Sequence, residues 1–214
     1  MERKQFGDLT FLVRGGMYDS QIINEDIKYG YMIPNDARMV IDIGAHIGST
    51  AILAAKKGSF VIAFEPDLEN FSMLRDNIII NNVGSRVLCV NKAVGVPSKR
   101  MLYKHKTNSG CYSLDKNNAS TKMYESCMVD VVSLESIFKE YSIDACDVLK
   151  LDCEGAEFDI LINLDDIYFK NIKQISLEIH EHHGRAMYAA LLKKLRRLYN
   201  TEFIIRKHNY VFSE

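Results

Sequence analysis

An apolar run that ends in an acid and then passes through a glycine-rich turn constrains the fold of this chain more than any other feature. The run VIDIGAHIGST spans residues 40–50. Val40, Ile41 and Ile43 suit a buried parallel strand, and the apolar residues after Gly48 begin a helical face. Glycines between a strand and a helix let the backbone turn tightly and approach a ligand closely. The pattern predicts a nucleotide-binding turn in an α/β fold.

The polar residues around this turn indicate the charge of its ligand. A dinucleotide fingerprint has a second glycine where His46 stands, because the pyrophosphate lies against bare backbone there. Asp42 lies at the strand end, where a carboxylate disfavours a diphosphate and favours a cationic ligand. Glu65 follows the next predicted strand, at about the 20-residue spacing that brings an acid to ribose hydroxyls. Two acids around a cationic nucleoside fit S-adenosylmethionine. NAD, or a turn without any ligand, is the alternative.

Strand-like and helix-like segments alternate from Met39 onward. This alternation predicts a doubly wound, Rossmann-like seven-stranded sheet that is mostly parallel. The last two strands are too close in sequence for a helical crossover, so they form an antiparallel C-terminal hairpin. Predicted strands cover residues 39–43, 60–65, 86–91, 147–152, 174–180, 202–206 and 209–213, and predicted helices cover 48–57, 67–81, 133–142, 156–163 and 184–199.

Residues outside this alternation divide into an edge segment and a loop. We predict that residues 1–38 cover one edge of a single catalytic domain, which spans 39–214. Between Lys99 and Asp130 the pattern weakens into KTNSGCYSLDKNNASTK, residues 106–122, with one short strand-like run on each side. This stretch is rich in Ser, Asn, Thr and Lys, which predicts a mobile loop that faces the substrate. Asn70, Asn77, Asn81 and Asn82 lie on or just past the second predicted helix, and we interpret them as a polar face and a carboxamide helix end.

Composition places the chain among globular proteins with one core. Its 214 residues are 47% hydrophobic, enough for one sizeable core. We see neither a spanning apolar run nor a signal peptide, so we expect a cytoplasmic protein without membrane insertion. With a net charge of -1 we expect no nucleic-acid partner, and we interpret the basic stretch at 193–207 as a solvated helix face. Five cysteines without a CxxC pair indicate reduced thiols. The oligomeric state stays open.

A second acidic constellation follows a later predicted strand. The stretch DVLKLDCEGAE, residues 147–157, ends its strand at Asp152 and Glu154. Ligands of open α/β sheets bind at the carboxyl ends of strands, so we expect these acids and Glu65 to line one crevice. His180 follows the next strand. A divalent metal at Asp152, Glu154 and His180 is an alternative, but strand alternation separates neighbouring histidines, and we assign no metal ligand.

In these motifs the chain resembles the FkbM family of S-adenosylmethionine-dependent methyltransferases, over roughly residues 19–180. The matching stretches are VIDIGAHIGST at 40–50, AFEPDLENFSMLRDNIIINN at 63–82, NKAVG at 91–95, NSGCYSL at 108–114 and LKLDCEGAEFDIL at 149–161. The resemblance implies a class I methyltransferase that methylates hydroxyl oxygens. Its acceptor would be a glycan or small molecule, such as a sugar, lipid or secondary metabolite.

The resemblance also implies roles for single residues. It places the methionine part of the cofactor against Asp42, Gly44, Ala45, His46 and Gly48, the ribose against Glu65 and Pro66, and the adenine against Lys92, Ala93 and Val94. It places Ser109 and Gly110 near the acceptor, and Asp152 and Glu154 beside the transferred methyl group, with Asp152 also at the cofactor. The chain departs from the family at His46, where Asn is commoner.

Methyl transfer is a displacement at a sulfonium carbon, so the enzyme chiefly aligns the acceptor oxygen with the methyl group. A sugar hydroxyl also needs a base, for which Asp152, Glu154 and His180 are the candidates. Acids that only cap the next helix are the structural alternative. Two other functions stay open: an RNA-modifying methyltransferase, which the basic stretch would serve, and an inactive cofactor-binding interaction protein.

Overall fold

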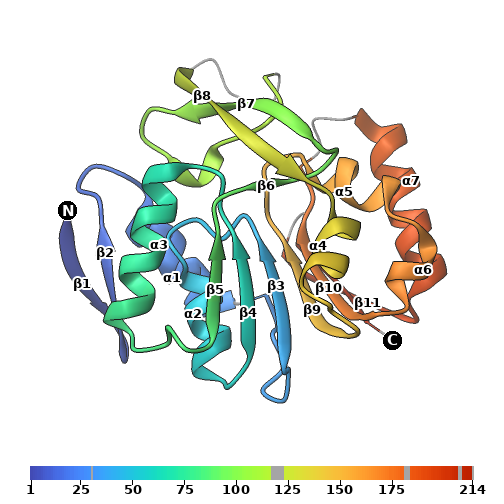
Figure 1. The fold of residues 1–214 in the computed structure, drawn as a ribbon, viewed down its shortest axis with the longest axis horizontal. Helices are drawn as coiled ribbons and strands as arrows, with labels where there is room; N and C mark the ends of the chain where they lie inside the picture. The colour runs from blue at the N-terminus through green and yellow to red at the C-terminus, as the bar shows by residue number, and fades with distance from the viewer. Residues whose placement is uncertain (30, 117–122, 181–183, 207–208, 214) are drawn as a thin grey trace.

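The computed structural model describes residues 1–29, 31–116, 123–180, 184–206 and 209–213. A central sheet of seven strands, with helices on both faces, organises this part of the chain (Figure 1). In spatial order the strands are β11 (Thr201–Arg206), β12 (Asn209–Ser213), β10 (Ile172–Glu178), β9 (Cys146–Leu151), β3 (Met39–Ile43), β4 (Phe60–Phe64) and β5 (Val87–Val90). The predicted α/β sheet is therefore confirmed.

All strands of the central sheet run in the same direction except β12. Strands β10, β9, β3, β4 and β5 pair in parallel, whereas β12 lies antiparallel between β10 and β11. Because so few residues link β11 to β12, the chain reverses in a hairpin instead of crossing over through a helix. The predicted antiparallel C-terminal hairpin is confirmed.

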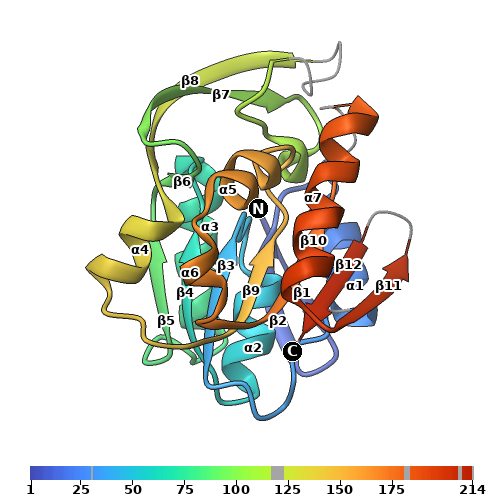
Figure 2. The same ribbon diagram turned by 90° about the vertical axis from the view of Figure 1, so that its right-hand side faces the viewer.

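Side-chain alternation along the strands builds a core on each face of the sheet. Ile41 and Ile43 of β3 pack with α4 (Leu134–Glu140), α5 (Glu157–Asn163), α6 (Asp166–Phe169) and α7 (Gly184–Leu198). Val40 faces the other way, toward α1 (Asp19–Tyr29), α2 (Ser49–Lys56) and α3 (Leu68–Ile80) (Figures 1 and 2). Among the described residues, no helix is both long and apolar enough to cross a membrane.

A small sheet lies over the carboxyl ends of β3, β4 and β5 (Figure 1). It consists of β6 (Ala93–Val94), β7 (Ser98–His105) and β8 (Met123–Val132), with β7 and β8 antiparallel. The strand-like runs expected on each side of the polar stretch are β7 and β8, and their side chains alternate: Leu102 and Val129 are buried, whereas Met101 and Met128 are exposed. Residues 117–122, in the connection between β7 and β8, lie outside the described residues.

Residues 1–38 form a hairpin of β1 (Glu2–Phe6) and β2 (Leu9–Val13), followed by α1. The side chains of α3 hold the backbone of this hairpin. Asn77 Oδ1 accepts from Leu12 N at 2.6 Å, and Asn81 Oδ1 accepts from Thr10 N at 3.1 Å. Both asparagines are buried, so the predicted polar face is turned toward the hairpin, and Asn81 lies at the end of the helix, as expected. Their carboxamides take the place of a neighbouring strand along the edge of β2.

Candidate active site

Two adjoining cavities lie at the carboxyl ends of the parallel strands. The first measures about 530 Å³, including its part open to solvent. Of the predicted site residues, its lining includes Gly44, His46, Glu65, Pro66, Lys92, Ala93, Val94, Ser109, Gly110, Asp152 and Glu154. The second measures about 800 Å³, shares Gly44, His46, Gly110, Asp152 and Glu154 with the first, and adds Ala45 and His180. The expected crevice containing Glu65, Asp152 and Glu154 is therefore present.

The glycine turn lets two strand ends approach each other. Gly44 has a φ of +78°, and a Cβ built on it would lie 1.9 Å from the carbonyl oxygen of Asp152. Gly48 has a φ of +98°, and its Cβ would lie 2.6 Å from a side-chain carbon of Leu74. Gly44 thus permits contact between the segments after β3 and β9, and Gly48 permits contact between the turn and α3.

Asp42 lies behind the turn and lines neither cavity. It stands opposite Lys150 in the parallel register of β3 and β9, and its Oδ1 is 3.0 Å from Lys150 Nζ. Both residues are buried. Lys150 Nζ also donates to the carbonyl oxygen of Gly44 at 2.7 Å. The expectation that the Asp42 carboxylate itself faces the ligand therefore differs from the structure, in which this carboxylate balances the charge of Lys150 and thereby holds the turn.

Glu65, just after β4, is buried but lines the first cavity. Its Oε2 accepts from the backbone N–H of His46, and its Oε1 accepts from that of Asp67, both at 2.9 Å. A longer hydrogen bond of 3.4 Å comes from Asn70. Burial raises the pKa of Glu65 to about 8, although these donors act in the opposite direction. A carboxylate has about four acceptor positions, so three donors leave capacity for a ligand hydroxyl.

A buried hydrogen-bond network behind His46 joins segments that are far apart in sequence. Asp19 accepts from Arg14 Nε at 3.0 Å and from Ser109 Oγ at 2.8 Å. Arg14 Nη2 also donates to Asn70 Oδ1 and to Ser109 Oγ, both at 2.8 Å. Because Ser109 donates its one proton to Asp19, His46 must donate through Nε2, which lies 2.7 Å from Ser109 Oγ. Burial lowers the pKa of His46 to about 4, so the ring is neutral.

The backbone conformation of His46 limits which residues suit this position. Its φ is +50°, a left-handed conformation that Asn and His adopt more readily than most residues. The sequence did not indicate the role of Arg14, because its partner Asn70 lies in a distant helix. Ser109 is only 2% exposed, so this part of the predicted mobile loop is anchored in the network.

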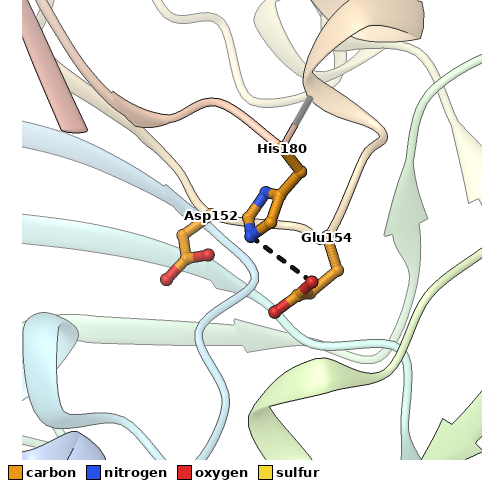
Figure 3. Close-up of side chains that lie close together, drawn as sticks. All are labelled: Asp152, Glu154 and His180. Atoms are coloured by element: carbon orange, nitrogen blue, oxygen red, sulfur yellow. Dashed lines mark ion pairs between the residues drawn. The ribbon is translucent and has the colours of Figure 1, made fainter. Parts of the chain in front are cut away.

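The segment between β9 and α5 carries the two predicted catalytic acids. Glu157, in the first turn of α5, accepts from the backbone N–H groups of Cys153 and Gly155, each at 2.9 Å. Glu154, between them, has a φ of +54°. This arrangement presents Glu154 toward the imidazole of His180, whose Nε2 is 3.3 Å from Glu154 Oε2 (Figure 3). Glu157 was not among the predicted site residues, although its acidic side chain at a helix start was an available signal.

The electrostatics of this cluster separate the candidate bases. Burial raises the pKa of Glu154 to about 7, even though His180 acts to lower it. Burial alone would lower the pKa of His180, but the carboxylates of Glu157 and Glu154 outweigh it and raise that pKa to about 10. A base works best when its pKa is near the working pH. These pKa values favour Glu154 over His180 as the base.

Asp152, Glu154 and His180 also meet a geometric criterion for a metal site, because one ligand atom of each lies within 4.8 Å of the others (Figure 3). However, His180 Nδ1 is 3.2 Å from Glu157 Oε1 and its Nε2 is 3.3 Å from Glu154 Oε2. A metal at this imidazole would have to displace one of these carboxylates. The contacts are those of an ion-paired imidazolium, and we assign no metal ligand.

Basic side chains of α7 stabilise neighbouring elements. Lys194 Nζ donates to the carbonyl oxygens of Ile162 and Leu164, at 3.1 and 2.7 Å. Arg197 Nη2 lies 2.6 Å from Asp166 Oδ2. These contacts hold the chain between α5 and α6. Lys193, Arg196 and Arg197 are exposed, as expected for a solvated helix face, whereas Lys194 is half-buried. Residues 207 and 208 lie outside the described part of the chain.

Comparison with known proteins identifies the family. Residues 42–212 match the model of the Methyltransferase FkbM domain. The chain is 27% identical over 169 residues to Methyltransferase 1 of Beauveria bassiana, covering 71% of this chain and 68% of that protein. It is 26% identical over 205 residues to the 31-O-demethyl-FK506 methyltransferase FkbM of Streptomyces tacrolimicus, covering 83% and 77%.

A solved structure shares the fold. The tRNA (uracil-54, C5)-methyltransferase of Pyrococcus abyssi, in complex with S-adenosyl-L-homocysteine, aligns with a TM-score of 0.52 and 15% identity. The alignment covers 99% of this chain but 42% of that structure. The family match extends from the end of β3 to β12 and includes both acidic segments of the cavities. The chain therefore belongs to the FkbM family of S-adenosylmethionine-dependent methyltransferases.

Proposed function

We propose that this protein transfers the methyl group of S-adenosylmethionine to a hydroxyl oxygen of a sugar, glycan, lipid or small metabolite. The observation that carries the proposal is the convergence of the glycine turn, Glu65 and the acids Asp152 and Glu154 on one pair of cavities. The Streptomyces relative supports oxygen as the acceptor atom, since it is named for a 31-O-demethyl substrate.

The first cavity fits the adenosine part of this cofactor. Glu65 has acceptor capacity for ribose hydroxyls, and Phe64, Val94 and Leu102 supply apolar walls for a planar base. The neutral ring of His46 lines both cavities, as does Gly44. When bound, the cofactor supplies a methyl group on a positively charged sulfur.

The residues at the junction of the cavities would direct the acceptor. Asp152 and Glu154 line both cavities, so an acceptor hydroxyl in the second cavity would meet these acids next to the cofactor. We propose that Glu154, with a pKa of about 7, accepts the hydroxyl proton as the carbon–oxygen bond forms. His180 would stabilise the ionised carboxylate, and Asp152 would orient the acceptor.

An assay with methyl-labelled S-adenosylmethionine tests this function. The acceptor panel would contain free hexoses, nucleotide sugars, glycolipids, a polyhydroxylated macrolide and unmodified tRNA. We expect label in a hydroxyl-bearing compound, as a methyl ether that survives alkaline hydrolysis. Label in tRNA alone would support the RNA-modifying alternative. Cofactor binding without label in any acceptor would support the inactive binding protein.

Variants of the active protein would then test the base. Glu154→Gln should lower kcat by roughly 100-fold, because general bases contribute about 10²–10⁴-fold. Glu125→Gln is the matched control, since Glu125 is exposed on β8, and it should retain wild-type turnover. Equal activity of Glu154→Gln and the wild type would contradict the role of Glu154 as the base.

A further inference from the structure

Tyr31 lies in the wall of the second cavity and contacts a candidate catalytic acid. Its hydroxyl donates a short hydrogen bond of 2.5 Å to Asp152 Oδ2, at the lower limit for an O–H donor on a carboxylate. Burial and the nearby Asp152 charge raise the pKa of the Tyr31 phenol well above its usual range. The phenol therefore keeps its proton and serves as a permanent donor to this carboxylate.

The ring and backbone of Tyr31 are held from two neighbouring strands. Its carbonyl oxygen accepts from Ser176 Oγ of β10 at 2.6 Å. Gln174, also on β10, donates to the next carbonyl along the chain, that of Met32, at 3.0 Å. On the other side, the ammonium of Lys150 on β9 lies 5.0 Å from the ring centroid, within the range of a cation–π contact. Tyr31 is only 7% exposed, so these contacts leave its hydroxyl little freedom to move.

We propose that Tyr31 is a positioning residue, which fixes the orientation of the Asp152 carboxylate for methyl transfer. This inference rests on the proposed function, because it gives Asp152 the task of orienting the acceptor. A carboxylate held by a rigid donor is already oriented when the acceptor binds, and small errors of alignment in a displacement reaction slow it strongly. The N-terminal segment thus contributes a residue to the transfer site, in addition to its packing along the edge.

The variant Tyr31→Phe removes only the hydroxyl and keeps the ring beside Lys150. With the acceptor found in the labelling assay, we expect kcat to fall about 10- to 100-fold, the effect of losing one hydrogen bond to a charged group. The Kd of S-adenosylhomocysteine, measured by calorimetry, should change less than about twofold, because loss of the hydrogen bond to Asp152 leaves the contacts around Glu65 intact. Tyr168→Phe, on α6, is the matched control and should leave both quantities unchanged.

A double-mutant cycle shows whether Tyr31 acts through Asp152. In an Asp152→Asn background, Tyr31→Phe should cause less than about a twofold further loss of kcat, because the group it orients is already altered. Proton NMR gives a second readout that needs no turnover. The hydrogen-bonded Tyr31 hydroxyl should give a downfield resonance that Tyr31→Phe abolishes, Asp152→Asn shifts and Tyr168→Phe retains.

The outcomes separate this inference from the proposed function. A wild-type protein that methylates an acceptor, together with a Tyr31→Phe variant of equal kcat, would overturn the inference and leave the function standing. Independent, multiplicative losses in the cycle would overturn it as well. If the wild type methylates no acceptor, the proposed function fails, and the inference fails with it even if the hydroxyl resonance confirms the hydrogen bond.

Discussion

At the scale of single residues, Gly44 allows the two strand ends at the site to meet. Its positive φ alone would cost an alanine about 1–2 kcal/mol, but its Cβ would also lie 1.9 Å from the carbonyl oxygen of Asp152. We predict that Gly44→Ala lowers the free energy of unfolding by several kcal/mol. Gly58→Ala is the control, because Gly58 has a φ of +103° with no atom near its Cβ. Urea denaturation showing equal losses for the two variants would contradict the close approach.

His46 makes a prediction about pH. Its pKa of about 4 lies below the unfolded value of 6.5, so the unfolded chain binds more protons between these values. The stability gained by burying the neutral ring is complete above pH 6.5 and is lost as pH falls toward 4. Between pH 7 and pH 5, the wild type should lose about 2 kcal/mol more than His46→Asn, whose side chain tolerates the left-handed backbone. If urea denaturation shows that the wild type and His46→Asn lose the same stability between these pH values, this titration is excluded.

At the scale of elements, the network of Arg14 and Asp19 fastens the N-terminal segment to α3, the glycine turn and the segment containing Ser109. Asp19 is fully buried, and its pKa is lowered because bonds from Arg14 outweigh the effect of burial. Removing one partner of a buried charge pair leaves the other without compensation. We therefore predict that Asp19→Asn lowers the free energy of unfolding by about 3 kcal/mol.

Chemical denaturation at neutral pH measures this loss. Asp76→Asn is the control, since Asp76 is exposed on the same helix that carries Asn70, and it should change stability by less than about 0.5 kcal/mol. If both variants are as stable as the wild type, the pair between Arg14 and Asp19 does not hold these elements together.

At the scale of the whole molecule, the central sheet was predictable because its strands are short runs of mostly apolar residues, as expected for buried strands. All seven strands of the central sheet fall within two residues of their predicted bounds. Strand-like runs were expected on each side of the polar stretch, where β7 and β8 lie, but their pairing with β6 in a separate sheet was not predicted. The local sequence pattern therefore predicts the strands of the central sheet, but not the small sheet that lies over their carboxyl ends.

The site was predictable where its residues follow the carboxyl ends of neighbouring strands. Strand ends brought Glu65, Asp152 and Glu154 to the first cavity, as predicted. The pairing of Asp42 with Lys150 could have been noticed, since each is a charged residue within an apolar strand. The roles of Tyr31 and Arg14 could not be predicted, because Tyr31 contacts Asp152, 121 residues away, and Arg14 contacts Ser109, 95 residues away. Such contacts depend on the register of the whole fold.

Calorimetric titration with S-adenosylmethionine, S-adenosylhomocysteine and NAD tests the central claim, that the cavity beside Glu65 binds an adenosyl sulfonium cofactor. We predict micromolar binding of the first two ligands and at least tenfold weaker binding in Glu65→Ala, with Glu125→Ala unchanged. Because the pKa of Glu65 is about 8 and hydroxyl donors favour its ionised form, binding at pH 7 should release protons, seen as a dependence of heat on the buffer. Absence of binding, preference for NAD, or full affinity in Glu65→Ala would contradict the account.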